Sequence, residues 1–114
     1  MGNPYSARIL VSEDPSISIF LRAILQRHGH QVTIGDADYA CNLLHAGISD
    51  VDLVITNTPR DFLPYAATLP VLYIAACHDA TLAARFAHCR MLSKPFRNHD
   101  LLDAVEDLAC CVVR

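Results

Sequence analysis

Positive charge is scarce in this sequence, and lysine is almost missing. Lys and Arg together number 9 against 12 Asp and Glu, which gives a net charge of −3, and Lys94 is the single lysine. Charged residues make up 18% of the chain, less than the quarter that is typical of folded domains. Without a basic excess or a basic cluster, a nucleic-acid-binding face is not expected.

Long apolar runs and export signals are lacking as well. The longest stretch without a charged residue, 62–77, contains Pro64 and Pro70 and is too short and too broken to span a membrane. The first residues lack the apolar core of a signal peptide. The chain has 5 cysteines and no Cys-x-x-Cys motif, which is typical of free thiols in a reducing compartment. We therefore expect a cytoplasmic protein that does not enter a membrane.

Apolar residues, by contrast, are plentiful. They form 53% of the 114 residues, enough to close one hydrophobic core without a metal or a disulfide. This content also excludes a disordered chain. We expect a single domain over 1–114.

Short apolar runs alternate with amphipathic stretches along the chain. The runs have the aliphatic and β-branched composition of buried strands, and Gly29 and Gly47 are placed to end helices. Residues 60–69 contain Pro64 and favour an irregular segment. Strands are expected over 8–12, 31–34, 52–56, 71–75 and 90–93; helices are expected between 13 and 29, over 37–46, over 81–88, and over 98–108 with Asn98 as the cap.

Apolar strands separated by helices predict a parallel sheet covered on both faces. With right-handed crossovers this is a doubly wound five-stranded α/β fold. Ligands bind such folds at the carboxyl ends of the strands. The residues expected at that edge are Ser12, Glu13, Asp14, Asn57, Ala75 and Lys94.

The order and spacing of these segments resemble a response-regulator receiver domain of two-component signalling. The resemblance runs from about Arg8 to Leu108. It rests on ILVSEDP, on DLVIT with Pro59 shortly after it, on PVLYIAA, and above all on the SKPF turn followed by LLDAV. It implies a flavodoxin-like receiver topology. The segment between Asn57 and Ala75 is shorter than receivers usually have, so the third helix should be shortened or missing.

Receivers accept a phosphoryl group from a histidine kinase. The resemblance implies a carboxylate nucleophile after the third strand and an acidic pair that holds a divalent metal. It also implies a hydroxyl after the fourth strand and a lysine after the fifth. These groups supply what phosphoryl transfer needs: a nucleophile in line with the leaving group, and cations that stabilise the negative charge of the phosphoryl oxygens.

The sequence departs from this pattern at most positions. Asn57 stands at the nucleophile position, and an amide cannot form an acyl phosphate. Ser12 and Glu13 fall at the acidic pair, with Asp14 next, and Ala75 replaces the hydroxyl residue.

Further along the chain, Met91 stands where receivers usually carry a switch aromatic, whereas Lys94 matches the family's lysine.

Several roles stay open for these residues. Asn57 either bonds nearby backbone at a strand end or mimics one phosphorylation state. Glu13 and Asp14 either favour a helix N-terminus or, at most, hold a residual Mg²⁺; otherwise no cofactor is expected. Lys94 either pairs with one of these two acids or binds an anion.

The shortened segment after the third strand also carries bulky apolar side chains. With less helix to bury them, some of Phe62, Leu63 and Tyr65 are expected to be exposed and to form a patch that faces a partner.

We therefore predict a pseudo-receiver, a protein–protein interaction module of bacterial signalling that acts without phosphorylation and is not an enzyme. Its partner would be a histidine kinase, another regulator or a second copy, and its contact face would lie over 81–88, 90–93 and 98–108. The alternative is a domain that senses a small anion in the remodelled pocket. A weaker third reading is a competent receiver that uses Asp14 or Asp61 instead.

Overall fold

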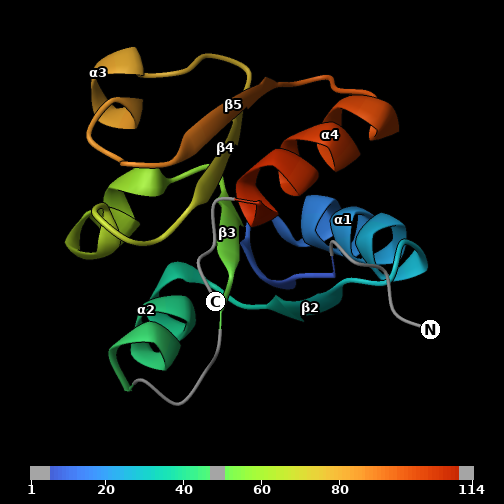
Figure 1. Cartoon of the computed structure of the whole chain (residues 1–114), viewed down its shortest axis with the longest axis horizontal. Helices are drawn as coiled ribbons and strands as arrows, with labels where there is room; N and C mark the ends of the chain where they lie inside the picture. The colour runs from blue at the N-terminus through green and yellow to red at the C-terminus, as the bar shows by residue number, and fades with distance from the viewer. Residues whose placement is uncertain (1–5, 47–50, 111–114) are drawn as a thin grey trace.

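A five-stranded parallel sheet forms the centre of the molecule (Figure 1). The computed structural model describes residues 6–46 and 51–110. The strand order is β2-β1-β3-β4-β5, so β2 and β5 are the edges. The strands are β1 (Arg8–Ser12), β2 (Gln31–Ile34), β3 (Leu53–Thr56), β4 (Val71–Ala75) and β5 (Cys89–Ser93). The predicted doubly wound α/β fold is confirmed.

Helices cover both faces of this sheet, as Figure 1 shows. Helices α1 and α4 pack on one face, and α2, η1 and α3 lie on the other. Their bounds are α1 (Pro15–Arg27), α2 (Ala37–Ala46), the 3₁₀ helix η1 (Pro59–Tyr65), α3 (Ala80–Ala83) and α4 (Asn98–Ala109). None of the helices in these described ranges is long and apolar enough to cross a membrane.

Alternation along β1 assigns each of its side chains to one of two cores. Ile9 and Val11 of β1 belong to the core under α1 and α4, whereas Leu10 between them belongs to the opposite core. Both faces of the strand are therefore buried, which explains why it reads as a continuous apolar run.

The segment after β3 corrects one expectation. The predicted irregular stretch contains η1, and the expected exposed patch does not form. Phe62 is fully buried, and Leu63 and Tyr65 pack against the same core. With the third helix reduced to a 3₁₀ turn, these side chains themselves cover the sheet.

Helix α3 is also shorter than the predicted span 81–88. It ends at Ala83, after which Phe86 becomes buried and the N–H of Ala87 donates to the carbonyl of Ala66 at 2.9 Å. Tertiary contacts with η1 thus end the helix early.

Two helix-end assignments need separate comment. Asn98 is the first residue of α4 rather than its cap, because Arg97 occupies the N-cap position. The predicted stop at Gly47 lies outside the described residues.

One histidine is part of the folded core. The Nδ1 atom of His30 accepts a hydrogen bond from the N–H of Ala7 at 3.0 Å, and the residue is 7% exposed. Burial lowers the pKa of His30 from its ordinary value of 6.5; nearby His28 lowers it further, and Glu106 raises it. The acceptor role of Nδ1 and the lowered pKa both favour the neutral ring.

Acid is therefore expected to destabilise the fold through His30. Below pH 6.5 the unfolded chain binds a proton that the folded chain still excludes, so the free energy of unfolding falls as the pH falls. Urea unfolding at several pH values measures this slope. His30→Asn keeps an acceptor without a titrating ring and should flatten the slope, whereas His45→Asn on the exposed end of α2 should not. An equal slope in both variants would assign the acid effect to other groups.

Candidate functional site

The carboxyl ends of the strands bring most of the predicted site residues to one edge. Ser12 ends β1 and lies opposite Thr56, which ends β3; both are buried. Ala75 ends β4, and its carbonyl accepts a hydrogen bond from the N–H of Lys94 at 3.0 Å. This bond extends the β4–β5 ladder by one residue and fixes the position of the Lys94 backbone, from which its side chain extends.

An ion pair between Glu13 and Lys94 dominates this edge. Lys94 Nζ lies 3.1 Å from Glu13 Oε2; the glutamate side chain is 0% exposed and the lysine side chain 26% exposed. Glu13 Oε1 accepts from the N–H of Asp14 at 2.9 Å. Within the described residues, Glu13 Oε2 has no hydrogen-bond partner that could replace the ammonium. Of the two pairings predicted for Lys94, the structure has the one with Glu13.

The two adjacent acids, which immediately precede α1, have different environments. Asp14 is the N-cap residue of α1, exposed and without a side-chain capping bond. Ser18 anchors the turn, since its Oγ donates to the carbonyl of Glu13 at 3.0 Å and its N–H to that of Asp14 at 2.8 Å. The structure thus buries one acid and leaves the other in solvent.

The turn after β3 is held by a threonine rather than by Asn57. Thr56 Oγ1 accepts from the N–H of Thr58 at 2.9 Å and lies 3.3 Å from the Thr58 hydroxyl. Asn57 is partly buried, and its side chain makes no hydrogen bond with the described residues. The local turn therefore does not depend on the amide.

His78 has a role that the sequence did not reveal. Its Nε2 lies 3.1 Å from the carbonyl oxygens of both Tyr73 and Leu92, on neighbouring strands, and its ring meets the Tyr73 ring edge-on at 4.8 Å. The N–H of Asp79 donates to the Tyr73 hydroxyl at 3.2 Å. These contacts hold the loop after Ala75 against β4 and β5. The sequence around His78, a histidine next to Cys77, contains no motif that predicts these contacts.

The donors at this edge do not fit a hard divalent metal. Glu13 directs one oxygen to Lys94 and the other to a backbone N–H, and Asn57 offers an amide in place of a carboxylate. Across residues 6–46 and 51–110, no group of three or more His, Cys, Asp or Glu side chains is placed to hold a metal ion. Mg²⁺ and Ca²⁺ prefer several oxygen ligands, mostly from carboxylates.

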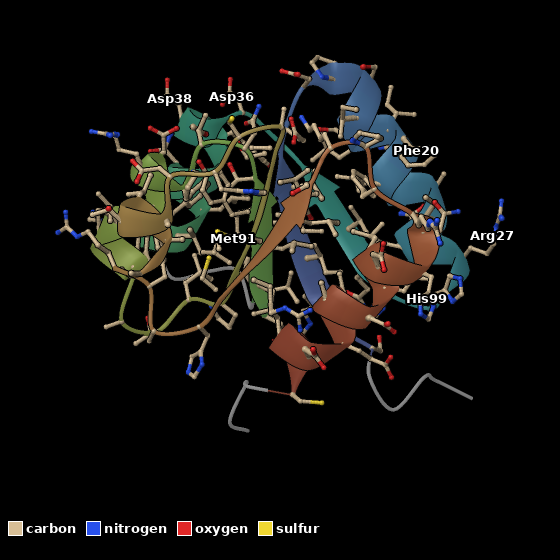
Figure 2. The ribbon with its side chains drawn as sticks, turned by 90° about the horizontal axis from the view of Figure 1, so that it is seen from above. Phe20, Arg27, Asp36, Asp38, Met91 and His99 are labelled. Atoms are coloured by element: carbon tan, nitrogen blue, oxygen red, sulfur yellow. The ribbon has the colours of Figure 1, made fainter. Side chains whose placement is uncertain are left out.

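Met91 lies away from this edge. It is 49% exposed in the middle of β5, where Figure 2 shows it on the α3 side of the strand. Met91 therefore presents a flexible thioether at the surface of the strand.

Comparison with known proteins finds this fold among receivers. No family model matches the chain, and no curated protein is similar to it. A response regulator receiver protein from Sinorhizobium medicae is 21% identical, with a TM-score of 0.75 over 92% of this chain and 95% of that one. The chemotaxis response regulator of Vibrio cholerae is 21% identical, with a TM-score of 0.73 over 90% and 98%. NtrX from Brucella abortus is 23% identical, with a TM-score of 0.78; the match covers 93% of this chain and 26% of NtrX.

These structural matches show that the chain has the receiver fold.

Removing the charge of Lys94 should destabilise the protein. A buried pair that loses one partner typically loses roughly 3–5 kcal/mol, and we expect about 2 kcal/mol for Lys94→Met because the lysine is partly exposed. Urea unfolding gives this value. The exposed Arg27→Met is the matched control and should change stability by less than about 0.5 kcal/mol.

The double variant Glu13→Gln/Lys94→Met distinguishes an ion pair from simple packing. Because the amide leaves no buried charge behind, the double variant should recover most of the stability that Lys94→Met loses. Additive losses in the double variant would contradict the pairing.

Proposed function

We propose that the chain is a receiver domain of two-component signalling that does not accept a phosphoryl group and acts as a phosphorylation-independent protein–protein interaction module. The observation that carries the proposal is the Glu13–Lys94 ion pair at the strand ends, beside Asn57. The cation that a phosphoryl group would need is already neutralised by a buried carboxylate.

The chemistry at Asn57 supports the same conclusion. Attack on a phosphoryl donor needs a nucleophilic oxygen in line with the leaving group. It also needs cations that stabilise the negative charge on the transferred phosphoryl oxygens. An amide oxygen is a poor nucleophile, and Ala75 supplies no hydroxyl at the fourth strand end. On this proposal the domain is a binding module rather than an enzyme.

Signal transfer through the domain would then need no chemical switch. In the described residues Met91 is the exposed large apolar side chain on the surface formed by α3, β5 and α4, which Figure 2 shows turned toward the viewer. We propose that this surface is presented permanently to a protein partner, either a histidine kinase, another regulator or a second copy.

The alternative of an anion sensor is less well supported. It requires Lys94 to meet the ligand, whereas its Nζ already lies 3.1 Å from Glu13 Oε2. An incoming anion would have to displace a carboxylate that has no exposed surface and would then remain buried without its counter-charge.

Labelling with acetyl phosphate and Mg²⁺ tests the proposed function. We expect no hydroxylamine-sensitive phosphoryl incorporation in the wild-type chain above the level of Asn57→Ala, because the strand end has no carboxylate. A typical receiver labelled in parallel shows that the donor is active. Stoichiometric, hydroxylamine-sensitive incorporation into the wild-type chain would overturn the proposal.

A further inference from the structure

Among residues 6–46 and 51–110, no strand pairs with the outer edge of β5, so its outward backbone groups have no partner in the sheet. The carbonyl of His88 accepts a hydrogen bond from β4 at 2.9 Å, and the N–H of Lys94 donates one to the end of β4 at 3.0 Å. Even-numbered residues of this stretch therefore direct their backbone groups toward β4. Because the direction alternates along a strand, the N–H and C=O groups of Cys89, Met91 and Ser93 point away from the sheet. Such an edge is a template for an added strand.

On the α3 side of this edge lies an apolar groove. It has a volume of about 300 Å³ and is lined by four alanines of the α3 segment together with Phe86, Cys89 and Met91. The groove borders the stretch where α3 ends after four residues. Small side chains on one wall and a flexible methionine on the other suit it to an apolar side chain.

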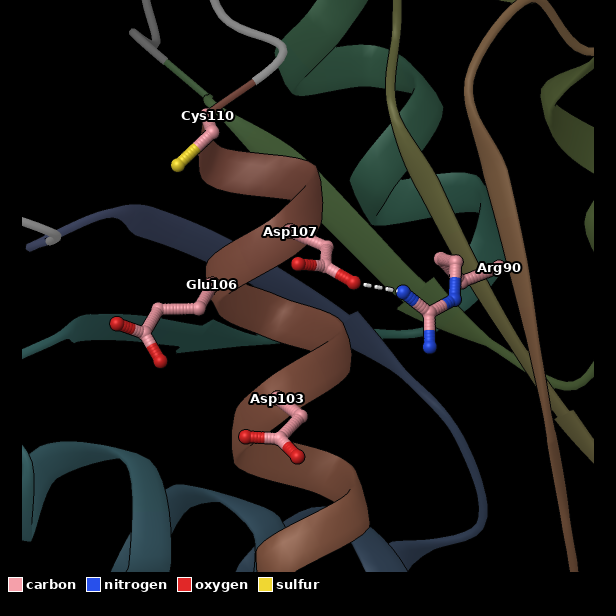
Figure 3. A pocket seen from close by; sticks show the side chains of 5 residues that line it. All are labelled: Arg90, Asp103, Glu106, Asp107 and Cys110. Carbon is pink, nitrogen blue, oxygen red and sulfur yellow. Dashed lines mark hydrogen bonds and ion pairs between the residues drawn. The ribbon is translucent and has the colours of Figure 1, made fainter.

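On the α4 side the lining is acidic. A cavity of about 390 Å³ is lined by Arg90, Asp103, Glu106, Asp107 and Cys110, as Figure 3 shows. Arg90 forms an ion pair with Asp107, and Figure 3 shows Glu106 directed away from Arg90. Asp103 Oδ2 lies 3.1 Å from His99 Nε2 on the same helix. The lining as a whole carries three carboxylates and one guanidinium. This side of the edge therefore favours an additional positive charge.

The two sides are connected across the beginning of β5. A third cavity of about 230 Å³ shares Ala87 and Cys89 with the apolar groove, and it shares Arg90 and Asp107 with the acidic one. A chain lying along the edge would therefore be in reach of both.

A strand added to β5 would direct successive side chains alternately to the two faces of the sheet. One set would enter the apolar groove beside α3, and the other would meet the carboxylates of α4. We propose that the β5 edge binds an extended protein segment in which apolar and basic residues alternate. This inference rests on the proposed interaction function and specifies the chemistry of its partner.

Charge argues against a second copy at this edge. Antiparallel pairing of β5 with β5 of another copy would continue the sheet and place both α4 helices on the same face. The carboxylates of Asp103, Glu106 and Asp107 would then approach their counterparts, and like charges across an interface are costly. A basic segment removes this repulsion.

Two synthetic peptides test the proposal, one with alternating lysine and valine and one with glutamate in place of lysine. We expect the lysine peptide to bind about tenfold more tightly than the glutamate peptide in a calorimetric titration, with the difference shrinking as salt is added. Amide hydrogen exchange should slow at Cys89, Met91 and Ser93 when the lysine peptide is bound.

Paired variants locate the site. Asp103→Asn/Glu106→Gln removes two charges from α4 and should weaken lysine-peptide binding about tenfold. Asp36→Asn/Asp38→Asn removes two charges at the start of α2 (Figure 2) and should leave binding unchanged. Asparagine preserves the acceptor that bonds the N–H of Tyr39 at 2.8 Å, so this control should fold. Met91→Gln should weaken binding, whereas Ile19→Gln on α1 should not.

Equal affinity for the two peptides, or slowed exchange at β2 instead of β5, would overturn the proposal. So would protection of the β5 amides that rises with protein concentration in the absence of peptide, which would assign the edge to a second copy. None of these results depends on phosphoryl labelling. A failed peptide test would therefore not contradict the phosphorylation-independent function. Phosphoryl incorporation would overturn that function without deciding whether the β5 edge binds the lysine peptide.

Discussion

The ion pair between Glu13 and Lys94 is the interaction on which the arrangement of the site depends. One partner follows β1 and the other follows β5, and β3 and β4 lie between them in the sheet. Two long side chains must therefore reach toward each other across the ends of the central strands. A glutamate without exposed surface needs a counter-charge, because removing a carboxylate from water costs several kcal/mol. The attraction of a positively charged partner must offset this cost. Lys94 supplies that charge and is thereby withdrawn from other ligands.

This constraint connects the ends of the sheet with its outer surface. The backbone of Lys94 extends the ladder beyond β5, and His78 holds the preceding loop against the same strands. A fixed strand end keeps β5 in register with β4, so the exposed edge of β5 has a defined shape. For the proposed interaction with a protein partner, such rigidity would lower the entropy lost on binding.

Strands could be predicted from the sequence almost to the residue, because each is an apolar run with turn residues around it. Helix lengths were less accessible. The early end of α3 depends on the burial of Phe86 and on a backbone hydrogen bond from Ala87 to Ala66, the residue after η1. Helix propensity alone predicts neither contact. The lysine was expected to pair with one of two adjacent acids, but the choice of Glu13 depends on the direction of the chain as α1 begins. The ring nitrogen of His78 contacts the backbone carbonyls of Tyr73 and Leu92, and the spacing of side chains in the sequence does not predict such contacts.

The central claim is that a buried carboxylate–ammonium pair has replaced a phosphoryl site in a receiver fold. A crystal structure of the protein grown with Mg²⁺ and acetyl phosphate tests this most directly. We predict that Lys94 Nζ stays within hydrogen-bond distance of Glu13 Oε2, with no metal on Glu13 and no group attached at Asn57. A metal bound to Glu13, with Lys94 turned toward a phosphoryl group, would contradict the claim.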